Sequence, residues 1–148
     1  MEVQPDFKEL LALLNAHRVD YVIVGGYALA YHGFPRFTAD LDILVKSDTE
    51  NSRRMIQALE EFGFEAAGLT PEDFQRPERV VQLGVPPVRV DILTSLTGVS
   101  WDEVSSGRVG GAFGGVEAHF IGRDQLIANK RALGRKRDLA DLEALGEG

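Results

Sequence analysis

Residues 20–45, DYVIVGGYALAYHGFPRFTADLDILV, place a glycine pair and a pair of aspartates between two apolar runs. The first run, Asp20–Val24, predicts a buried strand. Gly25-Gly26 ends that strand, and Tyr27–His32 predicts a short helix. Glycine lets backbone amides approach a ligand, and a helix N-terminus favours phosphate. This junction is therefore a candidate anion site, with an ordinary tight turn as the alternative.

The second run, Thr38–Val45, follows a loop over residues 33–36 and predicts another strand, which carries Asp40 and Asp42. Residues two apart on a strand point to the same side, so the two carboxylates share one face. Two close carboxylates repel unless a cation or a proton joins them, and Mg²⁺ prefers a few carboxylates together with substrate phosphates. The pattern predicts a metal site, with a solvated strand face as the alternative.

A third aspartate, Asp91, lies in the predicted strand Val88–Leu93. It faces away from the apolar residues with which it alternates. If this strand pairs beside residues 38–45, Asp91 joins the first two carboxylates. The alternative is a surface ion pair between Arg89 and Asp91, which contributes little to stability.

Lys130 lies on the apolar stripe of a predicted helix, at helical spacing from Leu126, Ile127 and Leu133. A lysine in such a position packs its aliphatic stem while its ammonium reaches toward a cleft. Asp138 lies in the same way on the apolar side of the next helix. Pairing on the helix surface is the alternative for both residues.

The remaining pattern favours an α+β fold, because helices and hairpin-like strand pairs follow each other in mixed order. We expect a mixed β-sheet flanked by helices, with a helical pair at the C-terminus. Gly110-Gly111 and Gly114-Gly115 both predict hairpin turns. The other predicted elements are helices over residues 5–17, 47–62 and 101–105, strands over 79–83 and 116–121, and closing helices over 123–133 and 135–145.

Composition sets the broad class. The chain has 148 residues, a net charge of −7 and no cysteine, which excludes disulfides and thiolate metal sites. No apolar run reaches the ~20 residues of a membrane span, and the start lacks the pattern of a signal peptide. We expect one domain over residues 1–148, located in the cytoplasm, with no membrane partner. Six basic residues lie within 123–138, so the acidic chain has a local anion site rather than a phosphate-binding face over its whole surface.

In order and spacing these motifs resemble the polymerase-β-like nucleotidyltransferase superfamily: Gly25-Gly26, the Asp40 and Asp42 pair, and Asp91 on a later strand. Residues 124–130 and 135–142 are similar to nucleotidyltransferase toxins of abortive-infection and toxin–antitoxin systems, in which a lysine and a later aspartate belong to the active site. Gly-Gly replaces the familiar Gly-Ser, so no serine hydroxyl is present for a phosphate. The short chain also leaves little room for the helical domain that binds the acceptor in many relatives.

The resemblance implies a minimal nucleotidyltransferase fold and transfer of an NMP from an NTP to an acceptor hydroxyl. Two Mg²⁺ ions, or Mn²⁺ in their place, would be held by Asp40, Asp42 and Asp91, which form the catalytic set together with Lys130. The predicted nucleotide-binding residues are Gly25, Gly26, Arg36, Thr38, Lys130 and Asp138.

The resemblance leaves the acceptor open between RNA or protein, as in toxins, and a small hydroxylated molecule, as in antibiotic modification. A catalytically idle, antitoxin-like interaction module is a third hypothesis. Because the chain is short, we expect a second copy or a partner protein near residues 123–138 to complete the acceptor platform. The alternative is a monomer with an open cleft.

Overall fold

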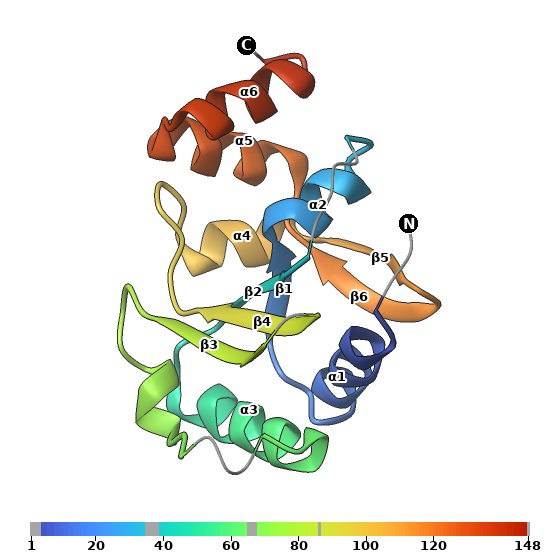
Figure 1. Ribbon diagram of the computed structural model, residues 1–148. Coiled ribbons are helices and arrows are strands. Elements are labelled where there is room, and N and C mark those ends of the chain that lie inside the picture. Colours follow the sequence, from blue (N-terminus) through green and yellow to red (C-terminus); the bar gives the residue numbers. More distant parts are fainter. Residues whose placement is uncertain (1–3, 35–38, 65–67, 86, 148) are drawn as a thin grey trace.

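The computed structural model describes residues 4–34, 39–64, 68–85 and 87–147, and the predicted nucleotide contacts Arg36 and Thr38 fall outside these ranges. Within the described residues, six strands form one mixed sheet in the order β3-β4-β2-β1-β6-β5 (Figure 1). The helices are α1 (Pro5–Ala16), α2 (Gly25–Tyr31), α3 (Thr49–Phe62), α4 (Trp101–Gly107), α5 (Arg123–Leu133) and α6 (Lys136–Ala144), with a 3₁₀ turn η2 (Pro71–Phe74). The strands are β1 (Tyr21–Val24), β2 (Leu41–Val45), β3 (Val80–Val85), β4 (Val88–Leu93), β5 (Val109–Phe113) and β6 (Val116–Phe120).

The strand pairing confirms the α+β prediction. β1 runs antiparallel to β2 and parallel to β6, while β2 runs parallel to β4. The antiparallel hairpins β3–β4 and β5–β6 complete the two sides of the sheet. The parallel pair β2–β4 brings two strands from distant parts of the sequence into register.

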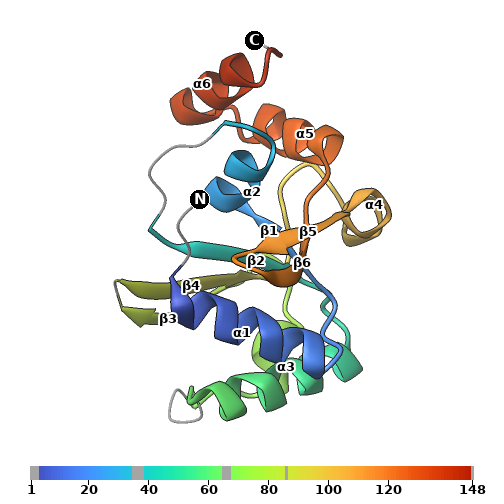
Figure 2. The same ribbon diagram turned by 90° about the vertical axis from the view of Figure 1, so that its right-hand side faces the viewer.

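The sheet has helices on both faces (Figure 2). α1 and α3 cover one face, and α2, α4, α5 and α6 lie on the other. Side chains along the central strands alternate between these faces: Leu41 and Ile43 of β2 pack toward α1, whereas Leu44 packs toward the second group of helices. Asp42 alternates with Leu41 and Ile43 and therefore faces the second group as well.

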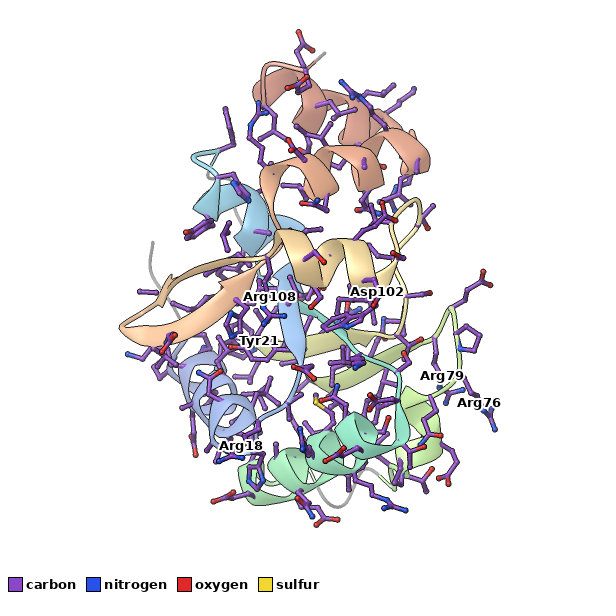
Figure 3. The ribbon with its side chains drawn as sticks, turned by 180° about the vertical axis from the view of Figure 1, so that it is seen from behind. Arg18, Tyr21, Arg76, Arg79, Asp102 and Arg108 are labelled. Atoms are coloured by element: carbon purple, nitrogen blue, oxygen red, sulfur yellow. The ribbon has the colours of Figure 1, made fainter. Side chains whose placement is uncertain are left out.

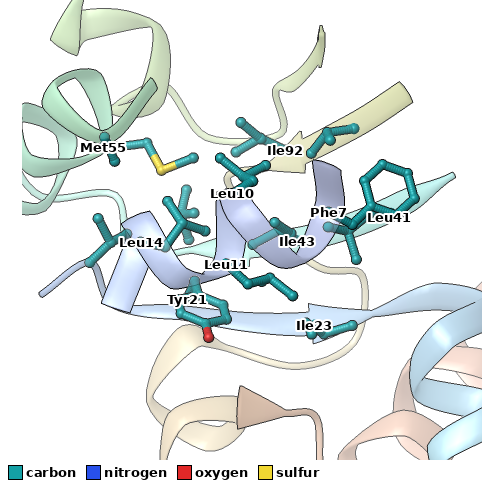
Figure 4. Packing of buried hydrophobic residues seen from close by; sticks show 14 of the residues in the cluster. Phe7, Leu10, Leu11, Leu14, Tyr21, Ile23, Leu41, Ile43, Met55 and Ile92 are labelled. Atoms are coloured by element: carbon teal, nitrogen blue, oxygen red, sulfur yellow. The ribbon is translucent and has the colours of Figure 1, made fainter. Parts of the chain in front are cut away.

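Local sequence signals set the ends of several helices. The amphipathic stripe of α1 is fully buried against the sheet through Phe7, Leu10, Leu11 and Leu14 (Figure 4). Asp48 caps α3 by accepting a hydrogen bond from the Asn51 amide at 2.7 Å. Gly63 ends the same helix in the left-handed conformation at φ 112°.

Some predicted boundaries were wrong. The short helix begins at Gly25 instead of Tyr27, and β2 begins at Leu41, so that Asp40 precedes the strand instead of lying on it. The pair Gly110-Gly111 lies inside β5 and not in a turn.

Packing from a distant segment accounts for one glycine of β5, Gly111, whereas a Cβ on Gly110 would meet open space. A Cβ on Gly111 would lie 2.4 Å from the ring of Tyr31, so the strand needs glycine where that ring packs. The Tyr31 hydroxyl also donates a hydrogen bond to the Gly110 carbonyl at 3.2 Å.

Candidate functional site

Two carboxylates face each other at the centre of the sheet. The β2–β4 register places Asp42 directly beside Asp91, as the sequence predicts for neighbouring strands. Both residues line a cleft of about 880 Å³ between the sheet and the α5–α6 pair. The cleft is large enough for a nucleotide-sized ligand, since small-molecule sites commonly measure ~300–1,000 Å³.

The start of α2 closes over one of these carboxylates. Gly25 has φ 70°, and a Cβ there would lie 2.2 Å from Asp42 Oδ2. Glycine is therefore required twice, once by the backbone conformation and once by the close approach of the carboxylate. Gly26 lines the cleft beside it, so the predicted anion site and the predicted carboxylate site form one surface.

The environment of Asp42 favours its neutral form. Burial, followed by the negative charges of Asp91 and Asp40, raises its pKa from 3.8 to about 6, while Arg89 and Arg137 oppose the shift. A bound cation would relieve this repulsion. The hard carboxylate oxygens of the pair Asp42 and Asp91 fit a divalent ion such as Mg²⁺.

Asp40 does not complete a compact three-carboxylate cluster. Among the described residues, no three acidic or histidine side chains lie close enough together to hold a metal ion. Asp40 instead lies beside Arg89, with 3.7 Å between its Oδ2 and the Arg89 Nε. The same guanidinium contacts both oxygens of Asp91, at 3.2 and 3.3 Å. A shared metal site for all three aspartates thus remains a prediction.

Lys130 forms the opposite wall of the cleft. It is 6% exposed, and it lies on the buried stripe of α5 as predicted. Its Nζ is 2.8 Å from Asp141 Oδ2 and 3.7 Å from Asp138 Oδ1. The ammonium is therefore held in place by α6.

Asp141 does not line the cleft but pairs with Lys130, and it was not singled out from the sequence. It lies one helical turn after Asp138 and is 6% exposed, so both carboxylates of α6 point toward α5. The spacing of three residues between two aspartates on the apolar face of α6 was the signal that would have identified it.

Asp138 has a structural task beside its contact with Lys130. Its carboxylate accepts hydrogen bonds from the Arg135 Nε at 2.6 Å and from the Arg135 amide at 3.2 Å, which caps the first turn of α6. The bond from the Arg135 side chain is the main cause that lowers the pKa of Asp138. The ion pair of Lys130 is shorter with Asp141 than with Asp138, so Asp141 is the principal partner of the lysine.

The third side of the cleft comes from two segments next to the β3–β4 hairpin. Residues 77–80 and 95–98 line it, and Arg76 and Arg79 lie where η2 leads into β3 (Figure 3). Thr94 joins the two segments, because its hydroxyl donates to the Arg76 carbonyl at 2.5 Å and accepts from the Arg79 amide at 2.9 Å. On α5, Asn129 donates to the Thr97 carbonyl at 2.8 Å and fixes the same wall.

Comparisons with known proteins place the fold. No protein-family model matches the sequence, and no curated protein matches it. The structure is similar to the crystal structure of a candidate nucleotidyltransferase from Thermotoga maritima, with a TM-score of 0.62 and 15% identity over 99% of this chain and 97% of that one. It is also similar to an antigenic nucleotidyltransferase-like protein from Paracoccidioides brasiliensis, with a TM-score of 0.54 and 16% identity over 98% of this chain and 76% of that one.

The chain therefore has the fold of these nucleotidyltransferase structures, as the motifs predict. No helix in the described ranges is long and apolar enough to cross a membrane.

Proposed function

We propose that this protein is a metal-dependent nucleotidyltransferase, which moves an NMP from an NTP to an acceptor hydroxyl and releases pyrophosphate. The observation that carries the proposal is a single cleft with the adjacent carboxylates of Asp42 and Asp91 on one wall and the buried ammonium of Lys130 on another. The similarity of the fold to two nucleotidyltransferase structures supports it.

The charge distribution of the cleft suits a nucleoside triphosphate bound with a divalent cation. Arg135 and Arg137 line the cleft on the same side as Lys130, so cationic groups lie opposite the acidic strands. A triphosphate is attracted by these cationic groups, and its cation by the carboxylates. Neither wall alone distinguishes a nucleotide from any other ion.

The carboxylates would hold Mg²⁺, or Mn²⁺ in its place, through Asp42 and Asp91, with Asp40 as the third predicted ligand. Such an ion would supply positive charge at the reacting phosphate. Asp91 lies at the cleft surface, and we propose that its carboxylate accepts the proton of the acceptor hydroxyl.

The remaining chain groups bind and orient the nucleotide. We propose that the backbone amides of Gly25 and Gly26 bind the phosphates together with Lys130. The ammonium of Lys130 offsets the negative charge that develops on the leaving pyrophosphate. Because Asp141 holds Lys130 in place, little reorganisation is needed when the substrate binds. Arg36, Thr38 and Asp138 remain predicted nucleotide contacts.

For the acceptor we propose a hydroxyl of RNA or protein, as in the toxins that the C-terminal motif resembles. A second copy or a partner near residues 123–138 would help to present it. Within that segment, Arg123 and Arg131 pair with Glu147, which leaves Lys136 among the cations able to attract such a partner. Light scattering after size exclusion tests the assembly: a strict monomer that modifies a small molecule at full rate without a partner would contradict it.

The direct test supplies each NTP, labelled at the α-phosphate, with Mg²⁺ or Mn²⁺ and a cell extract. We expect one NTP to label one class of acceptor, and Asp91→Asn to reduce the labelling at least ~100-fold. Glu61→Gln is the matched control, because Glu61 is an exposed carboxylate on α3. Equal labelling by wild type and Asp91→Asn, or no labelling from any NTP, would contradict the proposal.

A further inference from the structure

Arg89 is a cation that the fold places among the carboxylates of the site. It lies on β4, two residues before Asp91 and thus on the same face of the strand. Its Nε is 3.2 Å from Asp91 Oδ1 and 3.7 Å from Asp40 Oδ2, and its Nη2 donates to Asp91 Oδ2 at 3.3 Å. One guanidinium therefore contacts both oxygens of Asp91 and reaches Asp40 at the same time.

This contact orients Asp91 toward Arg89. Asp91 and Asp42 both line the cleft, whereas Arg89 and Asp40 lie outside its lining. The bidentate fork lies on that outer side and engages both Asp91 oxygens. It also explains why the described carboxylates do not converge as a metal site. Asp40 and Asp91 both contact the Arg89 guanidinium and do not meet Asp42 at one point.

The Arg89 side chain has room to leave. It is 33% exposed, and the residue in register with it on β3 is Gly84, which has no side chain to block another rotamer. On the β2 side its neighbour is Asp40, which precedes the strand. The guanidinium is therefore held mainly by the two carboxylates and not by packing.

We propose that Arg89 is the resident counter-ion of the metal-free site and competes with the divalent cation for Asp91. A cation ligated by Asp91 would lie within a few ångströms of the guanidinium, so the two positive charges repel and Arg89 must release the carboxylate. Once released by Arg89, Asp91 would be free to hold a cation together with Asp42, which lies in register with it. This inference rests on the proposed metal-dependent function, to which it adds a residue that lowers metal affinity in the resting state.

The test measures Mn²⁺ binding by isothermal titration calorimetry without nucleotide. We expect Arg89→Gln to bind Mn²⁺ about tenfold more tightly than wild type, because the competing charge is gone. Arg54→Gln is the matched control: it removes the same charge from a surface ion pair with Glu50 on α3 and should leave the Mn²⁺ affinity unchanged. Equal or weaker binding by Arg89→Gln would overturn the inference, since Arg89 would then be neutral toward the metal or would orient Asp91 for it.

Thermal melting provides a second readout. Without metal, Arg89→Gln should melt below wild type, because three carboxylates lose their counter-ion. Saturating Mn²⁺ should raise its melting temperature more than that of wild type, whereas a purely structural role would leave the two increments equal. If Arg89→Gln does not fold, Arg89→Lys decides: it keeps the charge, loses the fork and should bind Mn²⁺ about threefold more tightly. Absence of Mn²⁺ binding in every variant would overturn the metal-dependent function as well, while normal binding with no effect of Arg89 overturns this inference alone.

Discussion

The two faces of the sheet are built from different kinds of residue. The face under α1 and α3 is covered by a continuous apolar cluster that runs from Phe7 to Phe120. The face under α5 and α6 has a smaller apolar cluster, and beside it lie Asn129 and the ionised groups Lys130, Asp138 and Asp141, all less than a tenth exposed. Buried charges are expensive to desolvate even when paired, so this second face gives up stability that the first one supplies.

Buried polar groups are also present on the α1–α3 side, but they serve the backbone. Asn51 is 2% exposed, and its amide group bonds to backbone atoms of Asp20 and Lys46 at 2.7–3.0 Å. It joins α3 to the ends of two strands and presents nothing to a ligand. Lys130, by contrast, is a buried charge that lines the cleft, which is the kind of placement expected of a group that acts on a ligand.

The largest expected effect is on the apolar face. Leu11→Ala removes a fully buried side chain beneath the sheet and should lower the free energy of unfolding by ~2–5 kcal/mol. Leu13→Ala, on the same helix but only partly buried, is the control and should cost less. Urea denaturation measures both, and equal losses would show that α1 does not contribute through burial.

On the charged face, removing one partner of the Lys130–Asp141 pair should destabilise the fold, whereas removing both should not. Lys130→Met leaves Asp141 buried without its main partner and should cost about 2–4 kcal/mol. This loss of unfolding free energy is larger than expected for a lysine whose ammonium extends into a cleft without a buried partner. The double variant Lys130→Met with Asp141→Leu should recover most of that stability, yet bind NTP no better than the single variant. Recovery of nucleotide binding in the double variant would contradict the assigned role of Lys130.

A smaller effect is expected at Asp42 in the metal-free protein. Because its folded pKa is raised to about 6 from 3.8, its contribution favours the folded state below about pH 4 and is lost as pH rises through 6. Asp42→Asn has no such loss, so it should match wild type near pH 4 and be about 2–3 kcal/mol more stable above pH 7, since a pKa difference of one corresponds to about 1.4 kcal/mol. Urea denaturation with a chelator at both pH values measures this difference. A constant difference, or one that grows toward low pH, would show that burial and the neighbouring negative charges do not raise the pKa of Asp42.

The sequence predicted what depends on local pattern. Apolar periodicity located most of the strands and helices but not β5 or η2, and Asp42 faces away from Leu41 and Ile43 as the alternation along the strand predicts. The pairing of Asp42 with Asp91 was also predicted, on the condition that their strands lie side by side, because only the register of two distant strands decides it.

The predictions failed where a contact between distant residues overrides the local signal. Gly110-Gly111 has the pattern of a turn but lies in β5, where the Tyr31 ring packs against Gly111. The role of Asp141 depends on its ion pair with Lys130, which lies on another helix. The contact between Arg89 and Asp91 was predicted only as a surface ion pair. The additional contact of Arg89 with Asp40 depends on where β2 begins, which the local sequence does not determine.

The smallest effect should come from an exposed polar contact on the apolar face. His17, the C-terminal cap of α1, lies 2.5 Å from Glu61 of α3, but these side chains are 25% and 60% exposed. Water competes for both groups, so Glu61→Gln should change the free energy of unfolding by less than ~1 kcal/mol, with no effect on nucleotidyl transfer. The two helices already meet through buried side chains such as Leu14 and Met55. If Glu61→Gln destabilised the protein as much as Leu11→Ala does, the stability of this face would depend on its polar contacts, and its contrast with the charged face would fail.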